Sequence, residues 1–138
     1  MRFVSVEPPS FPQVAPNTPL PTAGGSRWQV LCGDAEHWRI GVYSPAAARA
    51  DQLTELERHT CPELFWLLEG RLTLLLAGPG GLRELPLEPG HPVLVTAPHD
   101  GFCPDGPHTG RALVVERDSF ATEYRVLQDW LDAGREAG

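Results

Sequence analysis

Glycine and proline interrupt this chain so often that long helices are excluded over most of its length. The 138 residues include 14 glycines and 15 prolines, and short apolar runs lie between these turn residues. Turns that recur about every 8–12 residues between such runs are typical of β-sandwiches and small barrels. With 41% hydrophobic residues, the chain can bury the core of one domain. We therefore predict an all-β fold of about nine short strands.

The apolar runs also predict where the strands lie, because turn residues such as Gly33 and Gly70 separate them. Residues 98–110 are rich in proline, aspartate and glycine, and we expect them to form a loop. The predicted strands are residues 28–32, 38–43, 63–68, 72–76, 82–87, 93–95 and 112–115, with a further extended segment over 53–59.

The first part of the chain has a different texture. Six prolines fall between Pro8 and Pro21, and proline removes the N–H donors that a central strand needs. Residues 1–26 are therefore predicted to be an extended arm that lies over the domain or across a partner subunit. A disordered tail is the alternative.

Helical spacing appears only at the other end of the chain. Apolar side chains recur there at intervals of three and four residues, with Ser119 as a candidate N-cap and Gly134 as a stop. The residues that carry this pattern are Phe120, Tyr124, Leu127 and Leu131. The predicted division is an arm over 1–26, a barrel over 27–118, and a helix with a tail over 119–138.

Charge and cysteine content exclude several classes of function. Eleven basic against 18 acidic residues give a net charge of −7, which argues against nucleic acid or an anionic membrane as partner. We find no apolar stretch of the roughly 18 residues that a membrane span needs, and no apolar signal-peptide run. The three cysteines match no zinc-knuckle spacing, so we expect reduced thiols in a cytoplasmic protein.

The window from Asp51 to Gly70 carries the most specific pattern. His59 is followed by Glu63 after three intervening residues, and Glu63 by Gly70 after six. The sequence ELFWLLEGRL begins at Glu63. This window resembles the first motif of the cupin family, G-x5-H-x-H-x3/4-E-x6-G. Asp51 replaces the leading glycine of that motif, and Glu57 replaces its first histidine.

The spacing has a physical reason. Side chains at positions i and i+2 of a strand point to the same face, so Glu57 and His59 can both face a barrel interior. A short turn then brings Glu63 onto the neighbouring strand. Imidazole together with carboxylate suits a divalent Fe, Mn, Ni, Cu or Zn ion. We predict His59 and Glu63 as metal ligands and Glu57 as a catalytic base or a further ligand.

The second cupin motif, G-x5-P-x-G-x2-H, should supply one more ligand, and here it is degenerate. Gly90 and Pro98 resemble its frame, but seven residues separate them instead of five. Counting from Pro98, the histidine position falls on Cys103. By local similarity, the sequence His-Asp-Gly-Phe that starts at His99 makes His99 the candidate. His108 is a third choice.

The resemblance implies a jelly-roll barrel (a double-stranded β-helix) that forms a homodimer and binds a small polar molecule, such as a sugar or an organic acid. It also implies a metal-dependent enzyme of isomerase, dioxygenase or decarboxylase type. The alternative is a non-catalytic binding or dimerisation module that has lost its metal. The loss of one histidine from the first motif favours that alternative.

Overall fold

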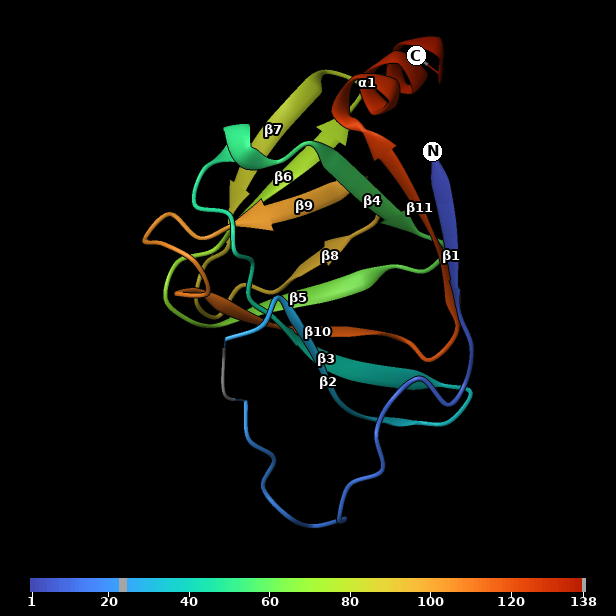
Figure 1. Ribbon diagram of the computed structural model, residues 1–138, viewed down its shortest axis with the longest axis vertical. Helices are drawn as coiled ribbons and strands as arrows, with labels where there is room; N and C mark the ends of the chain where they lie inside the picture. The colour runs from blue at the N-terminus through green and yellow to red at the C-terminus, as the bar shows by residue number, and fades with distance from the viewer. Residues whose placement is uncertain (23–24, 138) are drawn as a thin grey trace.

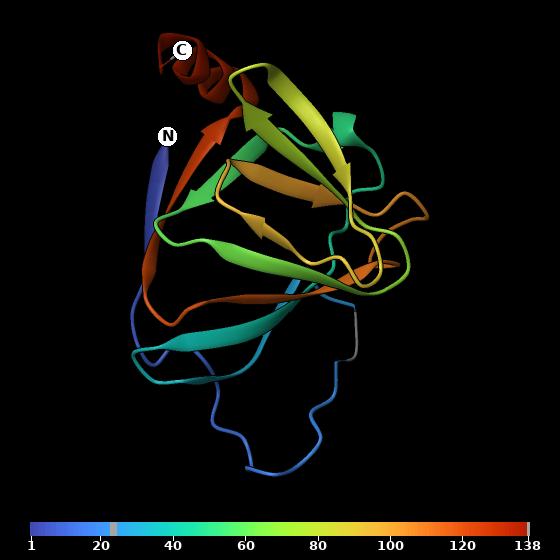
Figure 2. The ribbon, with the colours of Figure 1, turned by 180° about the vertical axis from the view of Figure 1, so that it is seen from behind.

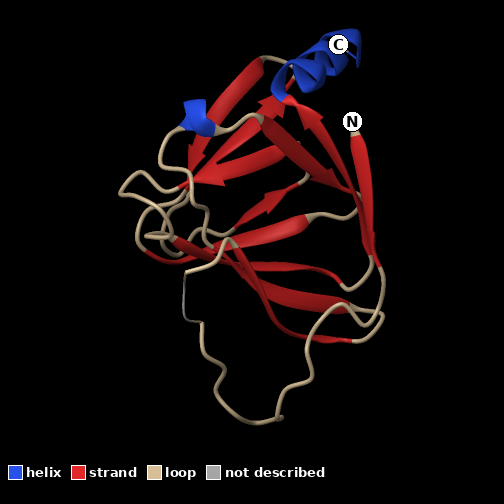
Figure 3. Cartoon of the chain, in the orientation of Figure 1, coloured by secondary structure: helices blue, strands red, loops and turns tan. Residues whose placement is uncertain are grey.

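The computed structural model describes residues 1–22 and 25–137, which fold into two antiparallel β-sheets and a C-terminal helix (Figure 1, Figure 3). The elements are β1 (Arg2–Val6), β2 (Trp28–Asp34), β3 (Trp38–Tyr43), the 3-10 turn η1 (Ala50–Gln52), β4 (Glu55–His59), β5 (Glu63–Glu69), β6 (Thr73–Gly78), β7 (Gly81–Pro86), β8 (Val93–Val95), β9 (His99–Phe102), β10 (Arg111–Arg117), β11 (Phe120–Val126) and α1 (Leu127–Ala137). In the described part of the chain, no helix has the length and hydropathy that crossing a membrane requires.

The order of the strands defines a jelly roll. One sheet, sheet A, runs β1-β11-β4-β9-β6-β7, and the other, sheet B, runs β2-β3-β10-β5-β8. From β4 onward the chain crosses repeatedly between the two sheets, and the β6–β7 hairpin stays within sheet A (Figure 2). The prediction of an all-β jelly roll is confirmed. Among the described strands no ladder joins the two sheets, so they face each other as layers with free edges.

Strand β6 shows how the sheets are held, because both of its faces are covered. Leu74 and Leu76 point into the space between the sheets and join the main core with Phe65 of β5 and Val114 of β10. Leu75, between them, points outward into a second core. This outer core lies beneath α1, and its other buried members are Leu53, Leu56, Ala77, Phe102 and Trp130. Helix α1 therefore covers part of the outer face of sheet A.

Two segments differ from the sequence-based expectation. The C-terminal helix begins at Leu127 rather than near Ser119, because the preceding residues form β11 between β1 and β4. Phe120 and Thr122 are buried on this strand by ordinary period-two alternation. The expected loop over 98–110 contains a strand, β9, whose residues pair with β4 and β6.

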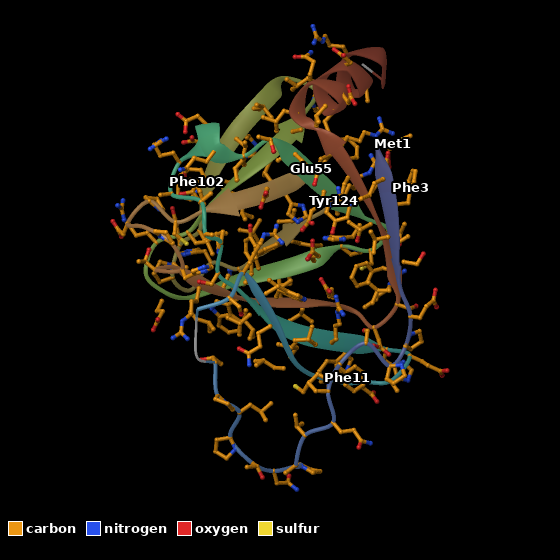
Figure 4. All side chains as sticks on the ribbon, in the orientation of Figure 1. Met1, Phe3, Phe11, Glu55, Phe102 and Tyr124 are labelled. Atoms are coloured by element: carbon orange, nitrogen blue, oxygen red, sulfur yellow. The ribbon has the colours of Figure 1, made fainter. Side chains whose placement is uncertain are left out.

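The N-terminal arm lies over its own domain. Strand β1 is the edge strand of sheet A and pairs only with β11 among the described strands. Beyond it, the buried Asp118 carboxylate accepts a hydrogen bond from the Ser10 backbone N–H at 2.8 Å and another from the Ser10 hydroxyl. Phe11 then lies at the end of the β2–β3 hairpin (Figure 4). The chain loops outward from there and returns at β2 (Figure 1).

Candidate metal centre

A cavity of about 280 Å³ lies between the two sheets, and β1, the edge strand of sheet A, contributes to its lining. Four polar side chains of the lining lie close together: Glu57, His59, Glu63 and His99. The rest of the lining includes the apolar side chains of Trp28, Val114 and Phe120, together with the guanidinium of Arg39 and the carboxyl group of Glu116.

Three strands bring the four polar side chains together. Glu57 and His59 occupy alternate positions of β4 and therefore point to the same side, into the cavity. The short turn over residues 60–62 lets Glu63 open β5 in the facing sheet. His99 opens β9 and lies opposite Glu57 in the β4–β9 ladder.

Both imidazoles are directed at one carboxylate oxygen. His59 Nε2 lies 2.8 Å from Glu63 Oε1, and His99 Nε2 lies 2.9 Å from the same atom. The Glu57 carboxylate stands 3.6 Å from His59 Nε2. One ligand atom each of Glu57, His59 and His99 falls within 4.8 Å of the others, a grouping that can hold a metal ion.

The tautomer of His99 sharpens this interpretation. Its Nδ1 lies 2.9 Å from the Ala97 carbonyl oxygen, which can only accept, so Nδ1 carries the proton. In the neutral ring, Nε2 then presents a lone pair to Glu63 Oε1. Both atoms are buried, and neither has a hydrogen-bond partner of acceptable geometry. Two acceptors this close repel each other unless a proton or a cation lies between them, so the residues fit a metal ion.

The other ring nitrogen of His59, Nδ1, has its own hydrogen-bond partner. This atom lies 2.7 Å from the hydroxyl oxygen of Thr122, on the neighbouring strand β11. This contact fixes the ring with Nε2 toward the cavity. Ligand histidines in metal sites are usually oriented in this way by a bond to the other ring nitrogen.

Electrostatics couple the cluster tightly. Burial disfavours a charged His59, but the nearby Glu57 and Glu63 carboxylates outweigh burial and raise its pKa to about 10. Burial also opposes the charge of His99, and the Glu63 carboxylate nevertheless raises the pKa of His99. The imidazoles in turn lower the pKa of Glu63 and Glu57 against the effect of burial. A divalent cation would take the place of the protons on the imidazoles.

A buried ion pair between Arg39 and Glu116 also lines the cavity. Arg39 of β3 and Glu116 of β10 face each other across the ladder, with Nε 2.7 Å from Oε2. The Ser10 carbonyl accepts a second bond from Arg39 Nη1 at 3.0 Å, and the guanidinium lies over the Phe120 ring. Burial, followed by the proximity of Glu63, raises the pKa of Glu116 to about 8.

A second polar group lies at the rim of the cavity. Asp100, next to His99 in the chain, accepts hydrogen bonds from Arg27 Nη2 at 3.0 Å and from the Tyr43 hydroxyl at 2.8 Å. Arg27 Nη2 also lies 4.0 Å from Glu57 Oε1. The rim therefore connects to the cluster through Glu57, and the Arg27 guanidinium offers N–H donors to a bound molecule.

The structure places Cys103 and His108 away from the cluster. The Cys103 thiol lies in the main core and donates a long hydrogen bond to the Gly110 carbonyl, at 3.5 Å. Strand β9 ends at Phe102, so the alternation that gives His99 its inward direction does not extend to Cys103. His108 donates from Nδ1 to the Ser44 carbonyl at 2.6 Å.

Sequence reasoning missed Arg27, Arg39, Tyr43 and Glu116. A signal for two of them is present in the sequence. Arg39 and Glu116 are charged residues within otherwise apolar β segments, and Glu116 continues the alternate positions of Ala112 and Val114, which indicates charge on an inward face. Their pairing depends on the β3–β10 register, which no local pattern predicts.

Similarity to known proteins is found in the backbone structure and not in the sequence. No protein-family model matches the sequence, and no curated protein matches it. Among solved structures, a cupin 2 domain-containing protein from Halorhodospira halophila is similar, with a TM-score of 0.56 and 16% identity. The similarity covers 97% of this chain and 88% of that chain. The chain has a cupin-type fold.

Two other solved structures are similar to this chain over a smaller share of their own length. Iron(II) HppE has a TM-score of 0.55 and 16% identity, over 82% of this chain and 64% of that chain. DMSP lyase DddQ from Ruegeria pomeroyi DSS-3 has a TM-score of 0.49 and 24% identity, over 65% of this chain and 45% of that chain. The chain thus spans about half to two thirds of the length of these two proteins. At 16% identity the similarity to HppE establishes the fold alone.

Proposed function

We propose that this cupin-type protein binds one divalent transition metal through His59, Glu63 and His99, with Glu57 beside them as a fourth ligand or a base. The observation that carries the proposal is the contact of two buried polar atoms, Glu63 Oε1 and His99 Nε2, at 2.9 Å, neither of which has a hydrogen-bond partner. Imidazole nitrogen and carboxylate oxygen together suit Fe, Mn, Ni, Cu or Zn.

Loss of the first cupin histidine by itself favours a metal-free module, but Glu57 offers a carboxylate oxygen in its place, 3.6 Å from His59 Nε2, and this supports a loaded site. Two carboxylates and two neutral imidazoles carry a charge of −2 and would neutralise a divalent cation in the half-buried cavity. A metal at this position would act as a Lewis acid on an oxygen of a bound molecule and would orient that molecule.

The chain itself contributes the remaining chemistry. Glu57 lies between the cluster and the rim, where its carboxylate can accept a proton from a molecule bound in the cavity. Arg27 supplies N–H donors at the rim that can orient a polar substituent. Trp28 and Phe120 add apolar surface to the lining, and such surface strengthens electrostatic contacts by excluding water.

We infer that the occupant is a small polar molecule and that the protein is a metal-dependent enzyme. The cavity volume of about 280 Å³ and its mixture of apolar wall and converging polar groups support this class of ligand. Isomerase, dioxygenase and decarboxylase chemistry are all compatible with the site. A homodimer and a cytoplasmic location stay predictions.

Metal content of the purified, tag-free protein tests the proposal directly. We expect about one divalent ion per chain by inductively coupled plasma mass spectrometry, with most of it lost in His99→Ala. Cys103→Ala serves as the matched control for the second motif and should keep the metal. Glu57→Gln should lower metal retention, whereas Glu55→Gln, two residues earlier on the same strand, should not.

Two outcomes contradict the proposal. If the protein binds no divalent ion even after soaking, the non-catalytic binding module becomes the better description. If Cys103→Ala loses metal while His99→Ala keeps it, the ligand set is wrong. Near-ultraviolet circular dichroism of each variant separates loss of ligands from loss of fold.

A further inference from the structure

A second hollow lies on the opposite side of sheet A, outside the metal centre. It has a volume of about 290 Å³ and is bounded by α1, by the β6–β7 hairpin and by strands β4 and β11. Ala77, Pro79, Pro98 and Ala133 give it an apolar lining. Its charged lining residues, within the described side chains, are Arg58 and Arg125.

These two arginines owe their position to the same alternation that builds the metal centre. Arg58 stands between Glu57 and His59 on β4, so it points away from the cavity. Arg125 follows Tyr124 on β11 and points the same way. Two guanidinium groups from adjacent strands thus meet on the outer face of the sheet.

The arginines are held in place by an aromatic ring. The guanidinium carbons of Arg58 and Arg125 lie 4.9 Å and 4.7 Å from the centre of the Trp130 ring. The indole N–H of Trp130 donates to the Leu56 carbonyl oxygen at 3.0 Å, which fixes the ring. A guanidinium that is stacked and partly immobilised loses less conformational entropy when it binds an anion.

The positive charge here exceeds the negative charge. Arg58 Nη2 lies 3.3 Å from Glu123 Oε2, and Arg125 pairs with Oε1 of the same carboxylate. One carboxylate therefore serves two guanidinium groups, each of which carries five N–H donors. A local excess of cation is unexpected on a chain whose net charge is −7, and it leaves donors beside an apolar hollow.

We propose that this hollow binds a small organic carboxylate with a flat apolar body. The carboxylate would accept hydrogen bonds from Arg58 and Arg125, and the apolar body would lie against Ala77, Pro98 and Ala133. The site uses none of the metal-centre side chains, so it is independent of the proposed metal. Because Arg58 is the residue between Glu57 and His59, the two sites share one strand.

Two tryptophans allow a direct test with benzoate as the probe. Trp130 lines the outer hollow, and Trp28 lines the inner cavity. In a titration followed by ¹H–¹⁵N NMR of the indole groups, we expect a saturable shift of the Trp130 resonance while that of Trp28 stays in place. Benzamide, the uncharged analogue, should bind at least about tenfold more weakly. Single Trp→Phe variants assign the resonances.

Variants then locate the anion contact. Replacing Arg58 and Arg125 together by glutamine should weaken benzoate at least about tenfold, whereas Arg83→Gln, an exposed arginine of β7, should leave its affinity unchanged. If the double variant does not fold, Ala133→Phe fills the hollow and should block binding without changing charge. The proposal is overturned if no saturable shift occurs, if Trp28 shifts instead, if benzamide binds equally well, or if these variants bind benzoate like the parent.

Discussion

The two faces of strands β4 and β11 differ in the charge of the side chains that they present. The inner face presents Glu57, His59 and Thr122 to a cavity between the sheets. The outer face presents Arg58 and Arg125, with one shared glutamate, to a hollow beneath α1. One side gathers carboxylates around imidazoles, and the other gathers guanidinium groups around an indole.

This difference shows what a one-residue alternation can separate. Side chains of consecutive residues lie on opposite sides of a sheet, so opposite charges can be concentrated on the two faces without neutralising each other. The inner face has the composition of a cation site and the outer face that of an anion site. The elements beside the two sites also differ: the edge strands β1 and β2 line the inner cavity, whereas α1 and the outer core support the outer hollow.

The largest expected effect is on the free energy of unfolding, when the core beneath α1 is disrupted. Leu56 is fully buried beneath α1, and Leu56→Ala should lower the free energy of unfolding by about 2–5 kcal/mol. Chemical denaturation measures it. Leu94→Ala, at a side chain that is 63% exposed, should change the free energy of unfolding by less than about 0.5 kcal/mol. Equal costs for both variants would contradict the packing described for α1.

The second effect concerns pH and the inner face. The pKa of His59 in the metal-free fold is raised to about 10, so its contribution to stability is complete below the unfolded value near 6.5 and vanishes as the pH passes 10. We expect the free energy of unfolding of the metal-free protein to fall by on the order of 2 kcal/mol across this window, allowing for carboxylates shared with His99. Denaturant titrations at successive pH values measure it.

Controls for this pH dependence lie on the same strand. His59→Gln should reduce the fall and leave the part due to His99 and to Glu116, whose pKa is raised to about 8. Arg58→Gln should leave the fall unchanged because arginine does not titrate in this range. The chain contains no lysine, so lysine side chains do not obscure the window. A parent protein whose stability is constant from pH 6.5 to 10 would show that the imidazole is not held by the two carboxylates.

The smallest effect tests the orientation of an imidazole. Thr122→Val removes the hydroxyl 2.7 Å from His59 Nδ1 with little change of shape, and it should weaken metal affinity about tenfold. Competition with a chelator measures the affinity. Thr54→Val, at an exposed threonine before β4, is the control and should keep the parent affinity. An unchanged affinity in Thr122→Val would mean that the ladder alone orients His59.

Much of this architecture could be predicted from local sequence. Strand β3 agrees residue for residue with its apolar run, and β2 and β5 extend only slightly past theirs. Period-two spacing also indicated correctly that Glu57 and His59 share a face, since that depends only on neighbours in the chain. Strand β11 was mistaken for helix because its apolar residues also fit a helical interval.

The choice between His99 and Cys103 needed the fold. Both have the same parity, and parity separates faces only while a strand continues. The strand ends at Phe102, and the Cys103 backbone N–H then bonds to the Ala47 carbonyl oxygen at 2.8 Å, outside any ladder. The Arg39–Glu116 pair likewise depends on a register between strands far apart in sequence. Local patterns carry no information on either point.

The attachment of Ser10 has a consequence for how the cavity could be monitored. The backbone N–H and the hydroxyl of Ser10 both donate hydrogen bonds to the Asp118 carboxylate. The Ser10 carbonyl accepts a hydrogen bond from Arg39, which lines the cavity. A molecule that bound in the cavity and contacted Arg39 would therefore also stabilise the Ser10 contacts of the arm. A protease would then cleave the exposed residues 12–19 more slowly when a molecule occupies the cavity. The rate of cleavage in the arm would therefore report whether the cavity is occupied.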